Sequence, residues 1–187
     1  MRKISAGFAM SLDGFIEGPK GEYDWIINDP EHFKEMAKSW EKTDAFFHGR
    51  KTYEMSMAMQ KKSGKVSKKN NPFAHMKHYV FSNTLDAVDS AFILVKGDVR
   101  KQVQAIRNEP GKDIAVFGGA QLACSLIGLG LVDELVVAIC PVLLGGGKSF
   151  FNGIDKKVQL TLTDSKVYAS GLVVVTYGIT GMTRSDG

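Results

Sequence analysis

The sequence predicts one α/β domain with a mostly parallel central sheet of about eight strands and an antiparallel hairpin at its C-terminal edge. Short apolar, β-branched runs alternate with helical patterns, and the last two runs follow each other with no helix between them. With 187 residues, 44% of them hydrophobic, the chain can bury one core and is too short for two ordinary domains. We expect the domain to cover residues 1–180 and residues 181–187 to form a flexible tail.

Eight segments have the composition of strands. They are KISAGFAM from Lys3, AFFHG from Ala45, HYVFS from His78, AFILV from Ala91, DIAVFG from Asp113, ELVVAIC from Glu134, VQLTLTD from Val158 and GLVVVTYGI from Gly171. Four segments carry the apolar spacing of helices. They are Pro30 to Trp40, Lys51 to Met59, Asp98 to Arg107 and Ala120 to Leu129.

Composition limits the possible function classes. No apolar run approaches the roughly 20 residues of a membrane span, and the N-terminus has no cleavage-site pattern, so we expect a cytoplasmic protein that does not enter membranes. Cys124 and Cys140 lie in apolar surroundings and are expected to be small buried hydrophobes. The basic segment from Lys61 to Asn71 predicts a solvated loop without interleaved aromatics, so we expect no nucleic-acid binding.

The stretch FFHGRKTYE places a glycine, two cations and a hydroxyl at the start of a predicted helix. Gly49 permits a tight turn, and the helix offers free N–H groups and the positive end of its dipole. Arg50 can present a guanidinium fork to a phosphate, Lys51 adds a second charge, and Thr52 adds a hydroxyl. These residues predict an anion site; a plain first helical turn with two solvated cations fits the tripeptide equally well.

Two further turns follow predicted strands, where ligands of parallel sheets gather. Gly118 and Gly119 stand between a buried strand and an apolar helix, so a pyrophosphate could approach the backbone there. The pair lacks the GxGxxG spacing of a standard dinucleotide site. Ser82 and Asn83, in FSNT, could line a nucleotide base or sugar, or could cap a turn.

Taken in order, these segments resemble the dihydrofolate reductase superfamily, and specifically the branch with the reductase domain of bacterial bifunctional riboflavin-biosynthesis proteins. The resemblance rests on MSLDGFI, GRKTYE, FSN, VFGGAQL and PVLLGGG, and it spans nearly the whole chain. It implies a dihydrofolate-reductase-like three-layer fold, a homodimer, and hydride transfer from NADPH to a small heterocyclic substrate without a metal. In the riboflavin branch this substrate is 5-amino-6-(5-phosphoribosylamino)uracil.

The same resemblance assigns cofactor contacts position by position, and two cations at the 2′-phosphate would favour NADPH over NADH. The implied contacts are the 2′-phosphate with Arg50, Lys51 and Thr52, the adenosine with Ser82 and Asn83, the pyrophosphate with Gly118, Gly119, Ala120 and Gln121, and the nicotinamide with Ala9, Ile16 and Phe117. Gly49 and Leu122 are expected to be further cofactor-binding residues.

The resemblance also implies a substrate side of the site, with contacts from Trp25, Phe33, Gly145 and Gly146. Two carboxylates are candidates for the catalytic proton transfer, together with an ordered water. Asp29 matches the D-x-x-x-F-K run of folate reductases, but Pro30 after it also makes it a good helix N-cap. Asp13 lies in the loop that borders the nicotinamide in this family.

Two departures from the family pattern leave the substrate open. Ala138 stands where folate reductases carry a threonine, and Phe117 stands where riboflavin reductases carry a glutamate. The chain also lacks the HxE and PCxxC motifs of the zinc deaminase domain. The alternatives are therefore a riboflavin-type reductase, a dihydrofolate reductase, or a related NADPH reductase with another substrate. A non-catalytic nucleotide- or nucleic-acid-binding protein is the alternative of another class.

Three of the four histidines are candidates for chemistry. His75 and His78 are three residues apart beside a strand, but no cysteine or carboxylate lies near them in sequence, so we expect no metal site. His48, just before Gly49, could shape the cofactor turn or pack as an ordinary side chain.

Overall fold

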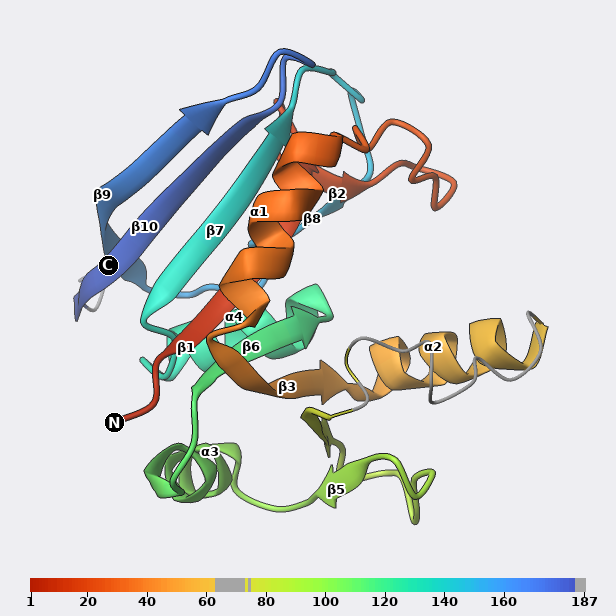
Figure 1. Ribbon diagram of the computed structural model, residues 1–187, viewed down its shortest axis with the longest axis vertical. Coiled ribbons are helices and arrows are strands. Elements are labelled where there is room, and N and C mark those ends of the chain that lie inside the picture. Colours follow the sequence, from red (N-terminus) through yellow and green to blue (C-terminus); the bar gives the residue numbers. More distant parts are fainter. Residues whose placement is uncertain (63–72, 74, 184–187) are drawn as a thin grey trace.

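The computed structural model describes residues 1–62, 73 and 75–183, and its centre is an eight-stranded sheet (Figure 1). The strand order is β5-β4-β3-β6-β1-β7-β10-β9; the first six strands are parallel, and β10 is antiparallel to both β7 and β9. The predicted α/β class with a C-terminal antiparallel hairpin is confirmed. The strands are β1 (Ile4–Ser11), β3 (Thr43–Gly49), β4 (Lys77–Phe81), β5 (Ile93–Val95), β6 (Asp113–Gly118), β7 (Glu134–Cys140), β9 (Lys157–Val167) and β10 (Val173–Thr183).

Within the part of the chain that the structure describes, four helices accompany the sheet, and each overlaps a predicted one. In the view of Figure 1, α1 crosses in front of the sheet and α4 lies behind it. Within the described ranges, no helix is long and apolar enough to cross a membrane. The helices are α1 (Pro30–Trp40), α2 (Arg50–Lys62), α3 (Val99–Asn108) and α4 (Ala120–Gly128).

Successive side chains along β7 point to opposite faces of the sheet, and each face has its own hydrophobic cluster. Leu135 and Val137 belong to the large cluster that includes the buried side chains of α4. Ala138 and Cys140 belong to a smaller cluster with Trp25 packed against it. Cys124 and Cys140 are buried free thiols, as predicted.

Element boundaries differ from the predicted ones mainly at the ends. The second helix begins at Arg50 and runs to Lys62, and β5 is shorter than expected because it begins at Ile93. The last strand continues to Thr183, so residues 181–183 belong to it, and the rest of the predicted tail lies outside the described residues. Most of the predicted lysine loop, residues 63–71, also lies outside them.

A second, two-stranded antiparallel sheet was not predicted. It pairs β2 (Phe15–Glu17) with β8 (Lys148–Ser149). Gly147, at a φ of +140°, makes the pairing possible, because a methyl carbon built on it would stand 2.1 Å from the carbonyl oxygen of Glu17. This small sheet joins the loop after β1 to the loop after β7.

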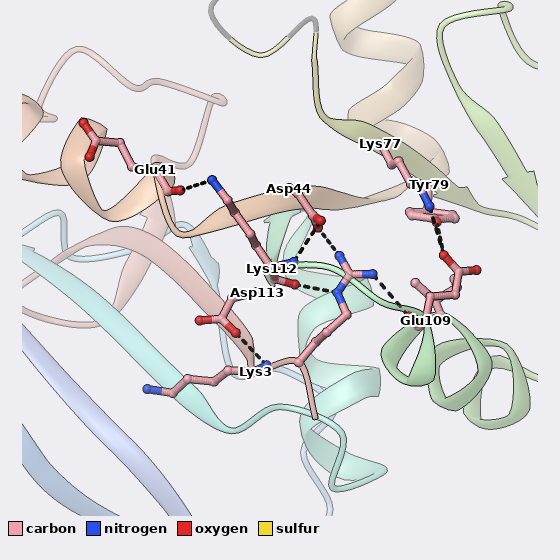
Figure 2. A network of polar contacts seen from close by, with 10 residues as sticks. Lys3, Glu41, Asp44, Lys77, Tyr79, Glu109, Lys112 and Asp113 are labelled. Carbon is pink, nitrogen blue, oxygen red and sulfur yellow. Dashed lines mark hydrogen bonds and ion pairs between the residues drawn. The ribbon is translucent and has the colours of Figure 1, made fainter.

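Figure 2 shows a polar network at the N-terminal ends of β1, β3 and β6. Arg2, only 5% exposed, donates to the backbone carbonyls of Lys112 and Ile106 and forms an ion pair with Asp44. The other Asp44 oxygen accepts the Lys112 N–H at 2.9 Å. These contacts fix the end of the sheet opposite the candidate site.

Candidate functional site

A cleft opens where β1 and β6 separate. Their pairing ends at Ala6 and Val116, although β1 continues to Ser11 and β6 to Gly118. The cleft has a volume of about 260 Å³. Six of the predicted cofactor residues line it together: Ala9, Ile16, Phe117, Gly118, Gly119 and Ala120. Residues far apart in the sequence thus meet at the carboxyl edge of the sheet, where ligands of such sheets bind.

The N-termini of α2 and α4 converge beside this cleft. A methyl carbon built on Gly119 would stand 3.1 Å from Thr52 Oγ1, and one built on Gly49 would stand 3.6 Å from the backbone nitrogen of Gly119. Leu122 packs against the same turn, because its Cβ would stand 3.5 Å from the methyl carbon built on Gly49. Two helix N-termini with glycines at their contact leave backbone donors accessible to a ligand with several phosphates.

The predicted phosphate cations are in reach of a ligand. Arg50 pairs with Glu54 at 3.1 Å, one helical turn along α2, and both side chains are nearly half exposed. Exposed pairs of this kind contribute little, so a phosphate can compete for the guanidinium. Lys51 is exposed on the same first turn. The residues present fit a phosphorylated dinucleotide.

Hydrogen bonds from its own side chains stabilise the FSNT turn. Ser82 Oγ accepts the N–H groups of Thr84 and Leu85 at 3.2 and 3.1 Å. Asn83 Oδ1 accepts the N–H of Gly97 at 2.7 Å and so ties β4 to the loop after β5. The turn-capping alternative therefore describes these side chains, and a contact with adenosine stays a prediction.

Asp13 organises the glycine-rich loop after β7. Its carboxylate accepts the Ser11 hydroxyl at 2.6 Å and the N–H groups of Leu144 and Gly145 at 3.1 and 2.8 Å. The Ser11 hydrogen bond and the two backbone donors lower the pKa of Asp13. The group is therefore ionised at neutral pH and acts as an acceptor that holds the two loops together.

Asp29 is the N-cap of α1, as its position before Pro30 predicts. Oδ1 accepts the N–H groups of Glu31 and His32 at 2.9 and 3.0 Å, and Oδ2 accepts the Ser170 hydroxyl at 2.6 Å. The Ser170 hydrogen bond is the main reason that the pKa of Asp29 is lowered. Both oxygens are thus engaged within the chain, and a catalytic role stays a prediction.

The remaining predicted substrate residues come from the segment before α1, from α1 itself and from the loop after β7, and their contact with a substrate stays a prediction. Trp25 donates its indole N–H to the Glu22 carbonyl at 3.0 Å and packs against the Ala138 cluster. Phe33 is 44% exposed on α1. Gly145 is held by Asp13, and Gly146 lies against Pro19.

The cleft also has lining side chains that sequence reasoning missed, among them Tyr23, Ile26 and Phe150. Tyr23 comes from the segment between β2 and α1, and its hydroxyl hydrogen-bonds with Glu17, which pairs with Lys148 at 3.2 Å. Burial, followed by the Glu17 contact, raises the pKa of Tyr23, so its proton is retained at neutral pH. The aromatic letters of GEYDWI and KSFF were the available signals.

Comparison with protein families gives one match over nearly the whole chain. The family model of the RibD C-terminal domain matches residues 2–174. An uncharacterized protein of Bacillus subtilis, YyaP, is 34% identical over 180 residues, which are 94% of each chain.

Solved structures share the fold. A provisionally named riboflavin biosynthesis protein of Shewanella sp. PV-4 has a TM-score of 0.80 at 23% identity, covering 96% of this chain and 99% of that one. The Thermotoga maritima diaminohydroxyphosphoribosylaminopyrimidine deaminase/5-amino-6-(5-phosphoribosylamino)uracil reductase has a TM-score of 0.71 at 16% identity, covering 96% and 57%. Dihydrofolate reductase of Enterococcus faecalis, complexed with NADP(H), has a TM-score of 0.63 at 16% identity, covering 96% and 97%. The dihydrofolate-reductase-like fold inferred from the sequence is confirmed.

Proposed function

The chain belongs to the RibD C-terminal domain family, and from this premise we propose that it is an NADPH-dependent reductase of a small heterocyclic substrate. One observation carries the proposal: the cleft between β1 and β6 opens at the same edge of the sheet as the joined N-termini of α2 and α4. The arrangement offers a narrow apolar slot for a flat ring beside two sites for phosphates.

Each part of the site has a task in this proposal. Arg50, Lys51 and Thr52 would hold the 2′-phosphate, and the turn at Gly118 and Gly119 would hold the pyrophosphate. Ala9, Ile16 and Phe117 would exclude water around the nicotinamide. The bound dinucleotide would supply the hydride, whereas the protein supplies orientation and charge.

A reductase of this type also needs a proton source. Asp13 and Asp29 have lowered pKa values and hold hydrogen bonds within the chain, so in this proposal they position loops and helix α1. Tyr23 lines the cleft and keeps its proton at neutral pH. Because the Tyr23 hydroxyl is itself hydrogen-bonded with Glu17, we assign the proton transfer to a water that Tyr23 orders in the cleft.

Within the riboflavin branch, the proposed substrate is 5-amino-6-(5-phosphoribosylamino)uracil or a close relative. Dihydrofolate is the second candidate, and two observations disfavour it. Ala138 is buried and has no hydroxyl for a folate-supporting hydrogen bond, and both oxygens of Asp29 are already engaged. Loss of such a buried network costs a few kcal/mol, or roughly two orders of magnitude in rate.

The test is to follow NADPH oxidation with each of the two compounds at saturating cofactor. We expect measurable reduction of the pyrimidine and weak or absent turnover of dihydrofolate. Rapid reduction of dihydrofolate, abolished in Asp29→Asn, would make Asp29 the pterin carboxylate and overturn the substrate assignment. If neither compound is reduced although NADPH binds, the substrate is another heterocycle and the riboflavin assignment fails.

A further inference from the structure

A buried histidine lies behind the wall of the cleft. His48, near the end of β3, is only 4% exposed. Its ring is surrounded by four others: the centroid distances are 5.2 Å to His78, 5.3 Å to Phe117, 5.8 Å to Phe92 and 6.2 Å to Phe46. Of these rings, Phe117 also lines the cleft, and it is 49% exposed.

The hydrogen bonds of the two histidines fix their tautomers. His78 Nε2 lies 3.2 Å from the carbonyl oxygen of Phe73, which can only accept, so His78 carries its proton on Nε2. His78 Nδ1, 3.0 Å from His48 Nε2, then has a lone pair and accepts the His48 proton. His48 is left with an unprotonated Nδ1. Burial lowers the pKa of both rings, that of His48 to about 4, so both are neutral at neutral pH.

The His48 Nδ1 lone pair has no hydrogen-bond partner among the described residues, and the atom is shielded from solvent. Buried polar atoms in folded proteins are nearly always paired, because an unpaired one costs a substantial part of its hydration free energy. An acceptor without a donor, one ring away from a ligand cleft, indicates that the donor comes from a ligand.

We propose that His48 Nδ1 accepts a hydrogen bond from an N–H group of the substrate, and that the substrate ring stacks on Phe117 after this side chain turns aside. This contact rests on the proposed function and adds to it a residue that determines specificity: His48 would favour a planar, uncharged heteroaromatic ring with an N–H donor over one without a donor. We expect the substrate ring to be planar because aromatic side chains surround the site. We expect this ring to be uncharged because the His48 acceptor is neutral and its surroundings are apolar.

The test compares 2-aminopyrimidine with 2-methylpyrimidine, two uncharged rings of nearly the same size of which only the first donates a hydrogen bond. NMR titration of the protein with each compound, with and without saturating NADP⁺, gives the affinity ratio. We expect His48→Leu to lower the preference for the amino compound about tenfold, the effect of one net hydrogen bond. The matched control is His75→Leu, at an exposed histidine, which should leave the ratio unchanged.

The chain has four histidines, so ¹⁵N-histidine labelling gives a second measurement that needs no turnover. In the unliganded protein, the ¹⁵N chemical shift of His48 Nδ1 should be that of an unprotonated nitrogen without a hydrogen bond. Of the two probes, only 2-aminopyrimidine should change this chemical shift. An unchanged ratio in His48→Leu, a resonance that no probe moves, or an Nδ1 already hydrogen-bonded to ordered water alone would overturn the proposal. Failure of NADP⁺ to bind, with the amino preference intact, would contradict the proposed function and leave this inference standing.

Discussion

Thr52 stands directly against Gly119: a methyl carbon built on the glycine would lie 3.1 Å from the threonine hydroxyl oxygen. The first turn of α2 and the first turn of α4 therefore share one small space at the edge of the sheet. This contact joins the segment proposed for the 2′-phosphate to the segment proposed for the pyrophosphate.

Gly119→Ala should weaken NADPH binding about tenfold or more, because overpacking at this contact costs roughly 1–3 kcal/mol and narrows the approach to the backbone. Isothermal titration calorimetry would measure the NADPH affinities of the natural protein and of the variant. Gly128→Ala is the matched control on the same helix, since a methyl group there meets nothing within 4 Å. Equal losses in the two variants would show that the convergence of the helices has no part in binding.

Replacement of Arg2 should destabilise the fold without changing the site. In Arg2→Leu, Asp44 loses its ion pair and two backbone carbonyls lose their donor, so we expect the free energy of unfolding to fall by about 2–4 kcal/mol. Urea unfolding would measure this, and NADPH affinity should be unchanged.

The control for Arg2 is Lys77→Ala, which removes an exposed ion pair with Glu109 at the same end of the sheet. Such pairs contribute at most about 1 kcal/mol. If Lys77→Ala lowered the free energy of unfolding as much as Arg2→Leu does, the buried guanidinium would not contribute more to stability than an exposed ion pair.

The cap at Asp29 predicts a pH-dependent stability. Because the folded-state pKa lies below the ordinary value of 3.8, Asp29 contributes stability that is fully present above pH 3.8 and is lost as pH falls through the lowered pKa. Asp29→Ala should therefore be less stable than the natural protein at neutral pH, and the gap should close in acid. Asp29→Asn keeps a capping acceptor without the charge and is the control. A gap of constant size from pH 7 to pH 2 would refute the assignment.

The homodimer that the family resemblance implies remains a prediction. The apolar strand β10 is an interior strand between β7 and β9, which accounts for its composition. One of the two edge strands of the sheet is β9, which exposes Leu162 and Val167. We expect light scattering at micromolar concentration to give twice the mass of one chain, and Leu162→Lys to shift it toward one. A monomeric natural protein would rule the dimer out.

Much of this fold could be predicted because its signals are local. Asp29 before Pro30 marks the start of α1, and the runs at Asp113 and Glu134 are continuous apolar strands as buried parallel strands require. The cofactor residues after the strands could be found because parallel strands bring their carboxyl ends to one edge.

The parts that could not be predicted depend on contacts between distant segments. The pairing of β2 with β8 needs Gly147 to pass against Glu17, and strands of two or three residues carry no pattern of their own. The hydrogen bond between His48 and His78 depends on the register of β3 with β4. Tyr23 enters the cleft from a loop without periodicity.

The central claim is that the N-terminus of α2 binds the 2′-phosphate of NADPH. The most direct measurement is the ratio of NADPH and NADH affinities, followed by the fluorescence of the two tryptophans. The two cations should favour NADPH by about tenfold to a thousandfold, equivalent to roughly 1.4 to 4 kcal/mol. Combined replacement of Arg50 and Lys51 by glutamine should bring the ratio near one, whereas Lys61→Gln, near the end of the same helix, should leave it intact. Equal affinities of the natural protein for NADPH and NADH would contradict the account.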